Sequence, residues 1–473
     1  MGQEIETPDF TPADLVEFRH RLDQETQLLA SWLSTGALPA GPKVGGFELE
    51  AWLVGPDLRP LPHAPDLLAR LADPLVVPEL ATFNLELNGT PQVLAGRALS
   101  AMAAELTRTW DQAQTVAQSL GARLAMVGIL PTVRAEDLIL DHMTPRNRYR
   151  ILNAQLGALR GHQPLRLDIQ GHDRLVLTRE DVMAESATTS FQILLRVSPP
   201  EAARVYNLSK ILSAPLVAVA ANSPFLFGRD LWRETRVPLF EQTCAMGDSG
   251  LRERVSFGLG YVRESVMECF TANLDQYPVI LPELLDEPPE RLAHLRLHNG
   301  TIWRWNRPLI GFDPDGSPHL RIEQRVVPAG PTVPDLIATA ALYFGAVQDL
   351  LTTAEPADAL LPFPVARANF YAAGRLGLEA ELHWLDDRPA TARTILTQDL
   401  LPRARRGLRA LDIDSDEIDT WLGLIAARLA RGQTGADWQR AWVRRHPDQD
   451  MTGLLQAYLD QQHSGRPVHE WTL

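Results

Sequence analysis

The sequence predicts an α+β fold, with a mainly antiparallel sheet in a body over residues 1–332 and a helical part over residues 333–473. Three stretches predict the sheet, because each alternates apolar residues with charged or amide residues, as strands with two different faces do. These stretches are 46–52, 83–88 and 320–325. Helical periodicity dominates after Val333, and the chain lacks the regular strand–helix alternation of a doubly wound parallel fold.

The elements of the first half follow in order from local patterns. Thr11 is suited to cap a helix over 11–34, because it precedes Pro12 and a periodic set of apolar residues. A turn at 40–43 leads into the strand at 46–52. The other elements predicted here are strand 83–88, helix 97–120, strand 123–128, a stretch over 141–160 that becomes helical toward its end, strand 186–197 and helix 200–219.

The second half divides into an irregular middle and a helical end. Residues 222–335 are rich in Pro and Gly and show a long helical period only near 251–270. Long irregular connections of this kind usually carry function or contacts between subdomains. The helices predicted after this segment are 333–353, 392–410, 415–431 and 450–463.

Composition excludes several classes of protein. The 473 residues are 45% hydrophobic and carry a net charge of −14, which argues against a general nucleic-acid binder and against binding to an anionic membrane. Cys244 and Cys269 are too few for a disulfide framework or a zinc site. The start lacks the basic and apolar regions of a signal peptide, and the apolar stretch 211–221 is too short to span a bilayer. We therefore expect a cytoplasmic protein.

The three alternating strands gather their charged side chains on shared faces. The groups are Glu48 with Glu50, then Asn84 with Glu86 and Asn88, and finally Arg321 with Glu323 and Arg325. Carboxylates two residues apart on one face stand roughly 6–7 Å apart, which is unfavourable without a cation between them. Carboxylates beside arginines suit Mg²⁺ and phosphate. An antiparallel sheet with one solvated face would give the same alternation without any chemistry, so that interpretation stays open.

Other polar clusters have a functional and a structural interpretation. Residues 145–150 hold three arginines, which suit either a solvated loop or a clamp on a phosphate or carboxylate. The segment 298–308 mixes aromatic, amide and arginine side chains, and its Trp303 and Trp305 suit either a core or a stacking surface. The sequence has no glycine-rich phosphate loop, no HExxH, no GxSxG and no kinase signature.

Six short motifs, taken in their order, resemble the glutamate–cysteine ligase family in its second, bacterial and plant-like branch. They are Gly-x-Glu-x-Glu at 46–50, the acidic residues Glu79 and Glu86, Arg148 with Tyr149, a Thr-Ser-x-Gln strand at 189–192, Asn-Ser-Pro at 222–224 and an Arg-x-Glu-x-Arg strand at 321–325. Together they span about residues 44–345. Many relatives have a His shortly after the Gln of the fourth motif, where this chain has Ile193, Leu194 and Leu195. This departure bears on specificity for cysteine.

The resemblance implies a glutamine-synthetase-like fold, whose curved antiparallel sheet holds metal, ATP and an amino acid on its concave face and carries helices on its convex side. It implies an ATP- and Mg²⁺-dependent carboxylate–amine ligase. In this reaction ATP phosphorylates the side-chain carboxylate of glutamate, and cysteine or a related amine attacks the acyl phosphate, as in glutathione biosynthesis. A ligase for another acid and amine, and a non-catalytic binding protein on the same fold, are the alternatives.

The resemblance and the strand faces together give each candidate residue an expected role. The expected ligands of Mg²⁺ or Mn²⁺ are Glu48, Glu50, Glu79, Glu86 and Glu323. The expected substrate- or nucleotide-binding residues are Arg146, Arg148, Tyr149, Ser190, Gln192, Arg236 and Arg321. Arg325 is expected to be catalytic by holding the transferred phosphoryl group, with a purely structural ion pair as the alternative. The expected partners are small molecules, ATP among them, with no nucleic acid and no membrane, and a homo-oligomer is left open.

Overall fold

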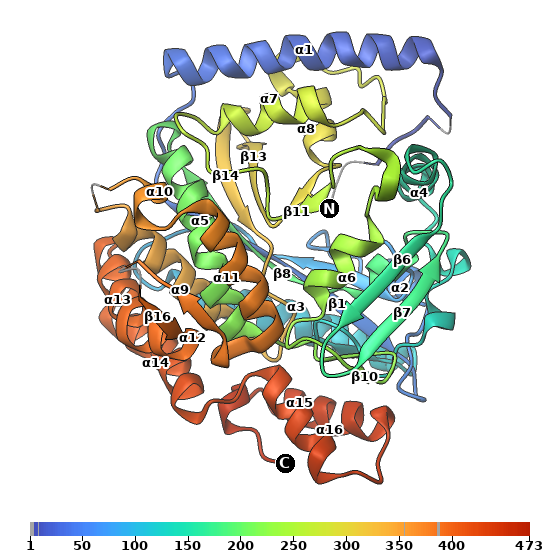
Figure 1. Cartoon of the computed structure of the whole chain (residues 1–473), viewed down its shortest axis with the longest axis vertical. Helices are drawn as coiled ribbons and strands as arrows, with labels where there is room; N and C mark the ends of the chain where they lie inside the picture. The colour runs from blue at the N-terminus through green and yellow to red at the C-terminus, as the bar shows by residue number, and fades with distance from the viewer. Residues whose placement is uncertain (1–3, 8, 354, 386–387) are drawn as a thin grey trace.

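The computed structural model describes residues 4–7, 9–353, 355–385 and 388–473. Its centre is a curled sheet with the strand order β13-β14-β8-β1-β3-β2, in which β4 and β5 also pair with β1 (Figure 1). The strand bounds are β1 Val44–Val54, β2 Val76–Pro78, β3 Asn84–Asn88, β4 Gln92–Val93, β5 Arg123–Ala125, β8 Phe191–Val197, β13 Asn306–Phe312 and β14 Pro318–Gln324. These pairings are antiparallel, so the predicted fold class is confirmed.

Helices and small two-stranded sheets surround this sheet. The helices are α1 Pro12–Thr35, α2 Ala64–Leu71, α3 Ala98–Ser119, α4 Asn147–Leu159, α5 Pro199–Ala220, α6 Arg236–Thr243, α7 Met267–Gln276, α8 Ala293–Asn299, α9 Val333–Leu350, α10 Ala357–Leu360, α11 Phe363–Leu376, α12 Ala392–Ile395, α13 Leu401–Ala410, α14 Ser415–Arg431, α15 Gly435–Arg445 and α16 Met451–His463. The two-stranded sheets are β6 Leu165–Gln170 with β7 Arg174–Arg179, β9 Phe225–Leu226 with β10 Arg229–Asp230, β11 Val255–Ser256 with β12 Trp303–Arg304, and β15 Glu381–His383 with β16 Pro389–Thr391.

Most of the predicted elements are present with small shifts of their ends. The strand predicted over 186–197 begins only at Phe191, because residues Met183–Ala187 form a 3₁₀ turn, η3. The prediction of helical structure near 251–270 is wrong for most of that segment. The segment contains β11 and irregular chain, and α7 begins only at Met267. No sequence pattern predicted α8, α11 or the β6–β7 hairpin.

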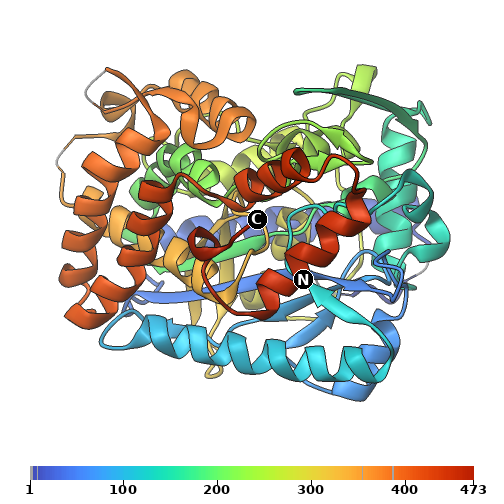
Figure 2. The same cartoon turned by 90° about the horizontal axis from the view of Figure 1, so that it is seen from below.

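The two faces of the central sheet have opposite chemistry. On one face Phe47, Leu49, Phe191 and Ile193 are buried in the main core. The helices α3, α5 and α9 pack against strands of the sheet on this side, and Figure 2 shows α3 as a long helix along one edge of the molecule. Burying this apolar face against helices supplies the hydrophobic stabilisation that a sheet with one apolar face requires.

A second group of helices covers the opposite, polar face. α8 contacts β13, and α1 lies across α7 and α8 at the top of the view (Figure 1). A buried contact fastens α1 to α8, because the Glu25 carboxylate lies 2.6 Å from Nδ1 of His294 and accepts a hydrogen bond of 2.8 Å from the backbone N–H of Leu295. The predicted helical layer on one side of the sheet is therefore joined by a second layer that encloses the polar face.

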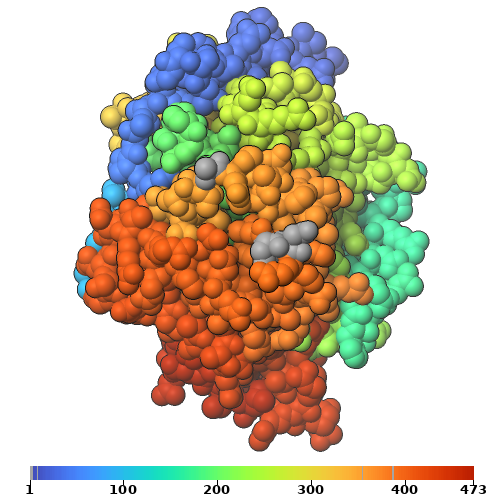
Figure 3. Space-filling view, turned by 60° about the vertical axis from the view of Figure 1, so that its left-hand side comes forward, coloured from blue at the N-terminus to red at the C-terminus, as the bar shows by residue number. Residues whose placement is uncertain are grey.

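The C-terminal helices form a continuous side of the molecule (Figure 3). Their first member, α9, packs against α5 and α13 in the main core. A buried ion pair joins α14 to α9, with an Arg428 Nη2 to Asp335 Oδ1 distance of 2.7 Å. The domain boundary between residues 332 and 333 stays a prediction. Among the described residues, we find no helix with the length and apolar character to cross a membrane.

The cap of α1 allows a direct test of the sequence-based prediction. The Thr11 hydroxyl accepts from the backbone N–H of Asp14 at 3.3 Å, and the Asp14 carboxylate accepts from the backbone N–H of Thr11 at 2.8 Å. We expect Thr11→Ala to lower the free energy of unfolding by about 1 kcal/mol, measured by urea denaturation. The control Ser34→Ala removes a hydroxyl that, among the described residues, bonds to the carbonyl of Ser31 alone. Equal losses in the two variants would contradict the capping role.

Candidate active site

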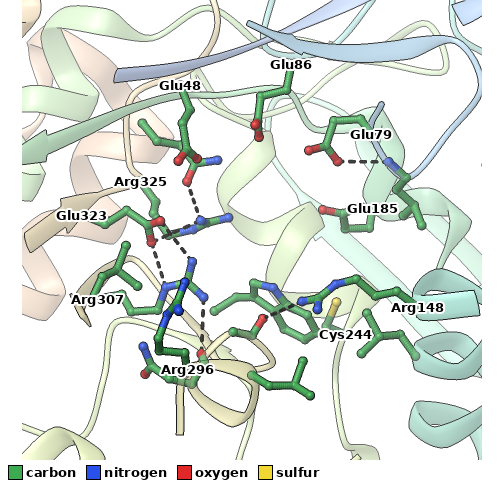
Figure 4. Close-up of a pocket in the computed structure, with 18 of the residues that line it drawn as sticks. Glu48, Glu79, Glu86, Arg148, Glu185, Cys244, Arg296, Arg307, Glu323 and Arg325 are labelled. Carbon is green, nitrogen blue, oxygen red and sulfur yellow. Dashed lines mark hydrogen bonds and ion pairs between the residues drawn. The ribbon is translucent and has the colours of Figure 1, made fainter. Parts of the chain in front are cut away.

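A cavity of about 280 Å³ lies between the polar face of the sheet and helices α4, α6, α7 and α8 (Figure 4). Polar side chains line the sheet side of this cavity, and all of them come from strands of the sheet except Arg325, which directly follows β14. They are Glu48, Glu50, Glu86, Gln192, Arg307, Arg321, Glu323 and Arg325. The strand alternation therefore brings the predicted carboxylates to one place. The face is enclosed, since Glu86 and Glu323 are only 1% and 2% exposed, so the interpretation as an ordinary solvated face is wrong.

Three carboxylates form a compact group on one side of this cavity. Glu50 and Glu86 are direct partners across β1 and β3, and Glu79 follows the end of β2. One oxygen of each of the three lies within 4.8 Å of the others. Burial raises the pKa of Glu79 well above its usual range, and the charges of Glu86 and Glu50 add to the shift. Such a group of oxygens repels itself, and it offers the ligand type that Mg²⁺ and Mn²⁺ prefer.

Two residues hold Glu50 in position, Ser190 just before β8 and Gln192 within it. The backbone N–H of Ser190 donates to one Glu50 oxygen at 2.7 Å, and the Gln192 amide donates to the other at 3.0 Å. The Gln192 carbonyl oxygen in turn accepts from Nη1 of Arg325 at 2.5 Å. Gln192 therefore connects the carboxylate group to the arginine side of the cavity, while Ser190 acts through its backbone.

Arginines and Glu323 form the other side of the cavity (Figure 4). Arg307 holds both oxygens of Glu323, at 2.9 and 3.0 Å, and Arg325 lies 3.2 Å from one of them. Burial opposes ionisation of Glu323, but these two guanidinium groups lower its pKa to about 2. Within the part of the chain that the structure describes, Nε of Arg325 has no hydrogen-bond partner. This side therefore carries net positive charge and an unused donor.

Glu48 occupies the same strand face as Glu50 but lies outside the three-carboxylate group. Burial, and then the charge of Glu86, raise the pKa of Glu48 to about 7. The folded protein without metal therefore binds a proton at Glu48 that the unfolded chain, with a pKa near 4.5, has already released at neutral pH.

This difference predicts how the stability of the metal-free protein depends on pH. Because the folded state holds the proton more tightly, stability falls as the pH rises from about 4.5 to about 7. We expect Glu48→Gln to remove this loss and to raise the free energy of unfolding at pH 8 by on the order of 2 kcal/mol, with a much smaller gain at pH 5. Urea denaturation in EDTA at the two pH values measures it. A gain independent of pH would contradict the assignment.

The remaining predicted residues fall into two groups, those that line the cavity and those that do not. Arg148 and Tyr149 of α4 line the cavity with Arg321. Arg148 donates to the carbonyl of Gly300 at 3.4 Å. Ser190, Arg146 and Arg236 do not belong to the cavity lining. Arg146 lies 3.5 Å from the carboxylate of Glu4.

Arg236 supports the chain that carries Arg325. Its guanidinium pairs with Glu234 at 3.1 Å and donates to the carbonyls of Arg325 and Val326 at 3.2 and 2.7 Å. This residue is 2% exposed, so its charge is used within the protein. The binding roles given to all these residues by the sequence stay predictions.

Several lining residues were not identified from the sequence. Arg307 and Asn299 lie in the polar and aromatic segment 298–308, whose composition was the available signal. Arg296 lies in the short helix α8, and Glu185 lies in the 3₁₀ turn η3, where no strand alternation marks them. Burial raises the pKa of Glu185 to about 8, with Glu50 as the second cause.

Comparisons with known proteins found similar solved structures and a matching family model. The structure is similar to that of a glutamate–cysteine ligase from Francisella tularensis in complex with AMP, with a TM-score of 0.53 and 12% identity over 92% of this chain and 90% of that one. It is also similar to a bifunctional glutathione synthetase from Pasteurella multocida, with a TM-score of 0.45 and 12% identity over 95% of this chain and 55% of that one. No curated protein matches the chain. A family model described as glutamate–cysteine ligase family 2 matches residues 44–461, and the chain therefore belongs to glutamate–cysteine ligase family 2.

Proposed function

We propose that this carboxylate–amine ligase uses ATP and Mg²⁺ to join the side-chain carboxylate of glutamate to the amine of cysteine or a related compound through an acyl phosphate. The observation that carries the proposal is the division of one enclosed cavity into two sides. The group Glu50, Glu79 and Glu86 faces the network of Arg307, Arg325 and Glu323. Metal–phosphate substrates need both kinds of charge close together.

The carboxylate group fits a divalent metal ion by the chemistry of its donors. Glu50, Glu79 and Glu86 would hold Mg²⁺ or Mn²⁺, and the raised pKa of Glu79 reflects burial and repulsion that a cation would relieve. When bound, the ion would neutralise charge on the phosphates of ATP. Mg²⁺ usually takes only one or two protein carboxylates, so Glu48 and Glu323 need not be ligands. In this proposal Glu323 positions Arg307 and Arg325.

The arginines would act on the phosphoryl group. Arg325 would donate to oxygens of the group in transfer, and Arg321 would add positive charge from the same strand face. Arg148 of α4 would bind the carboxylic acid substrate, and Tyr149 beside it would be a further substrate contact in the same cavity. Phosphoryl transfer depends mainly on positioning and charge, so this chain needs no nucleophilic side chain for it.

One assay tests the proposal and separates it from its alternatives. Purified protein is incubated with ATP, Mg²⁺ and glutamate, with and without cysteine, while ADP release is followed and the products are identified by mass spectrometry. We expect ADP release that requires both substrates and a product with one new amide bond. Release with other acids or amines, but not with these, would favour a ligase of different specificity. Failure to bind ATP with Mg²⁺ in calorimetry would favour a binding protein.

A further inference from the structure

Glu185 is a cavity carboxylate that belongs neither to the three-carboxylate group nor to the arginine network. It comes from η3 and is half-buried, and it lines the cavity beside Glu79 and Cys244 (Figure 4). Its backbone carbonyl accepts from Thr188, but its carboxylate makes no hydrogen bond and no ion pair within the residues that the structure describes. A carboxylate held inside a protein without a partner is costly, which points to a ligand with positive charge.

Apart from Glu79, the walls near Glu185 include a group of apolar side chains. α6 packs against η3, and Phe240 of α6 lines the cavity with Cys244, which directly follows this helix. Val182 precedes η3, and Leu156 comes from α4. All four of these side chains are buried. Burial raises the pKa of the Cys244 thiol well above its usual range, with Glu185 as the second cause, so this sulfur remains an uncharged part of the wall. A ligand on Glu185 would therefore carry its charge at one end and an apolar substituent at the other.

A second polar group in this cavity also lacks a partner. The Tyr149 side chain lines the cavity and is only 7% exposed, and its hydroxyl has no hydrogen-bond partner among the described residues. A hydroxyl can both donate and accept one hydrogen bond, so it can contact an amine in either protonation state. Buried hydroxyl groups without a partner are uncommon, and this one is independent of the acidic residues as a sign of a missing ligand.

We propose that Glu185 binds the acceptor amine as its ammonium form and takes the proton that the amine must lose, with Tyr149 as a second contact and the wall of Val182, Leu156, Phe240 and Cys244 around the substituent. The acceptor class is thus a primary amine whose side chain is uncharged, to which cysteine with its thiol belongs. This inference rests on the proposed ligase function and adds the acceptor side of the site to it.

The proposed step balances in atoms and charge. The ammonium gives one proton to Glu185, which passes it to solvent. The amine lone pair then forms a C–N bond to the acyl carbon, and the C–O bond to the phosphate breaks, with its electron pair leaving on the phosphate. The second N–H proton leaves with the phosphate, so that an acyl phosphate and an ammonium give an amide, hydrogen phosphate and one proton.

Hydroxylamine separates this role from a general effect on the enzyme. It is largely uncharged at neutral pH and attacks acyl phosphates directly, so it needs neither an ammonium site nor a proton acceptor. We expect Glu185→Gln to lower kcat/KM for the amine acceptor by about 100-fold, while hydroxamate formation from ATP, Mg²⁺ and glutamate stays within about threefold of the native rate. The control is Glu180→Gln, which changes an exposed carboxylate just before η3 and should leave both reactions unchanged.

The outcomes distinguish this inference from the proposed function. Equal losses in both reactions, or no loss in either, would overturn the role of Glu185 while leaving the ligase function intact. Absence of hydroxamate formation in the native protein would instead reject the acyl phosphate mechanism and this inference with it.

The apolar wall has its own test with a matched pair of inhibitors. Butylamine and 1,4-diaminobutane have the same carbon chain, but the second would place another ammonium against the wall. We expect butylamine to inhibit the amine-dependent reaction at least about tenfold more strongly in competition with the acceptor, because an unpaired charge is costly to bury. Equal inhibition, or stronger inhibition by the diamine, would overturn the assignment of an apolar substituent.

Discussion

Arg325→Lys is expected to keep the fold and to lower turnover by roughly 10²–10³, the usual scale for the loss of one oriented donor to a developing charge. The native guanidinium contacts Gln192 and Glu323 through Nη1, and its Nε has no partner among the described residues. Its planar fork therefore keeps at least one donor, the Nε–H, for an oxygen of a phosphoryl group. A lysine would keep the charge and could still pair with Glu323, but it cannot present two donors in one plane.

The measurement is ADP release at saturating ATP and substrates, with the unfolding free energy followed in parallel. Arg196→Lys is the matched control, because Arg196 lies on the neighbouring strand β8, pairs with Asp313 at 3.0 Å and does not line the cavity. We expect near-native turnover in this control. Near-native turnover in Arg325→Lys as well would show that Arg325 serves only as a counter-charge for the buried carboxylates.

The carboxylate half of the site could be predicted because it depends on a local rule. The period of two along a strand fixes which side chains share a face, and Glu48 and Glu50 follow it within one strand. That Glu86 would stand directly opposite Glu50 depends on strand pairing and register. The strand pattern indicated a common polar face, while the neighbouring order β14-β8-β1-β3 came only with the structure.

The helical half of the cavity could not be predicted in the same way. Arg296 is one charged residue on a helix of seven residues, and only the packing of that helix above the sheet makes it a lining residue. Glu185 belongs to a 3₁₀ turn inside a segment that the sequence predicts as strand. Arg236 shows the opposite case, since a conspicuous arginine near a polar turn is used to hold the backbone at Arg325 and Val326. Tertiary contacts decide such positions, and residue type alone does not.

Glu86→Gln is expected to weaken the binding of ATP in the presence of Mg²⁺ by at least about 10–100-fold. This is the usual cost of losing a residue that supports a metal ligand, and the loss of a ligand itself should cost no less. Glu86 lies in the three-carboxylate group, and its Oε1 accepts from Asn88 at 3.0 Å. Glutamine has the same shape and can keep this acceptor, so the change removes charge with little effect on packing. The charge of Glu86 also raises the pKa of Glu79, so its removal should ease the repulsion in the metal-free protein.

Calorimetric titration of ATP in Mg²⁺ and in EDTA measures the metal-dependent part of the affinity. Glu48→Gln is the matched comparison, since Glu48 lies on the same strand face as Glu50 but outside the group of three oxygens. We expect a clearly smaller loss of Mg²⁺-dependent affinity for that variant, and little change in EDTA for either one. If both variants lost the same affinity, the metal would lie between Glu48 and Glu86. If Glu86→Gln bound ATP with Mg²⁺ as tightly as the native protein does, these carboxylates would not hold the metal, and their repulsion would have to be relieved by protons alone.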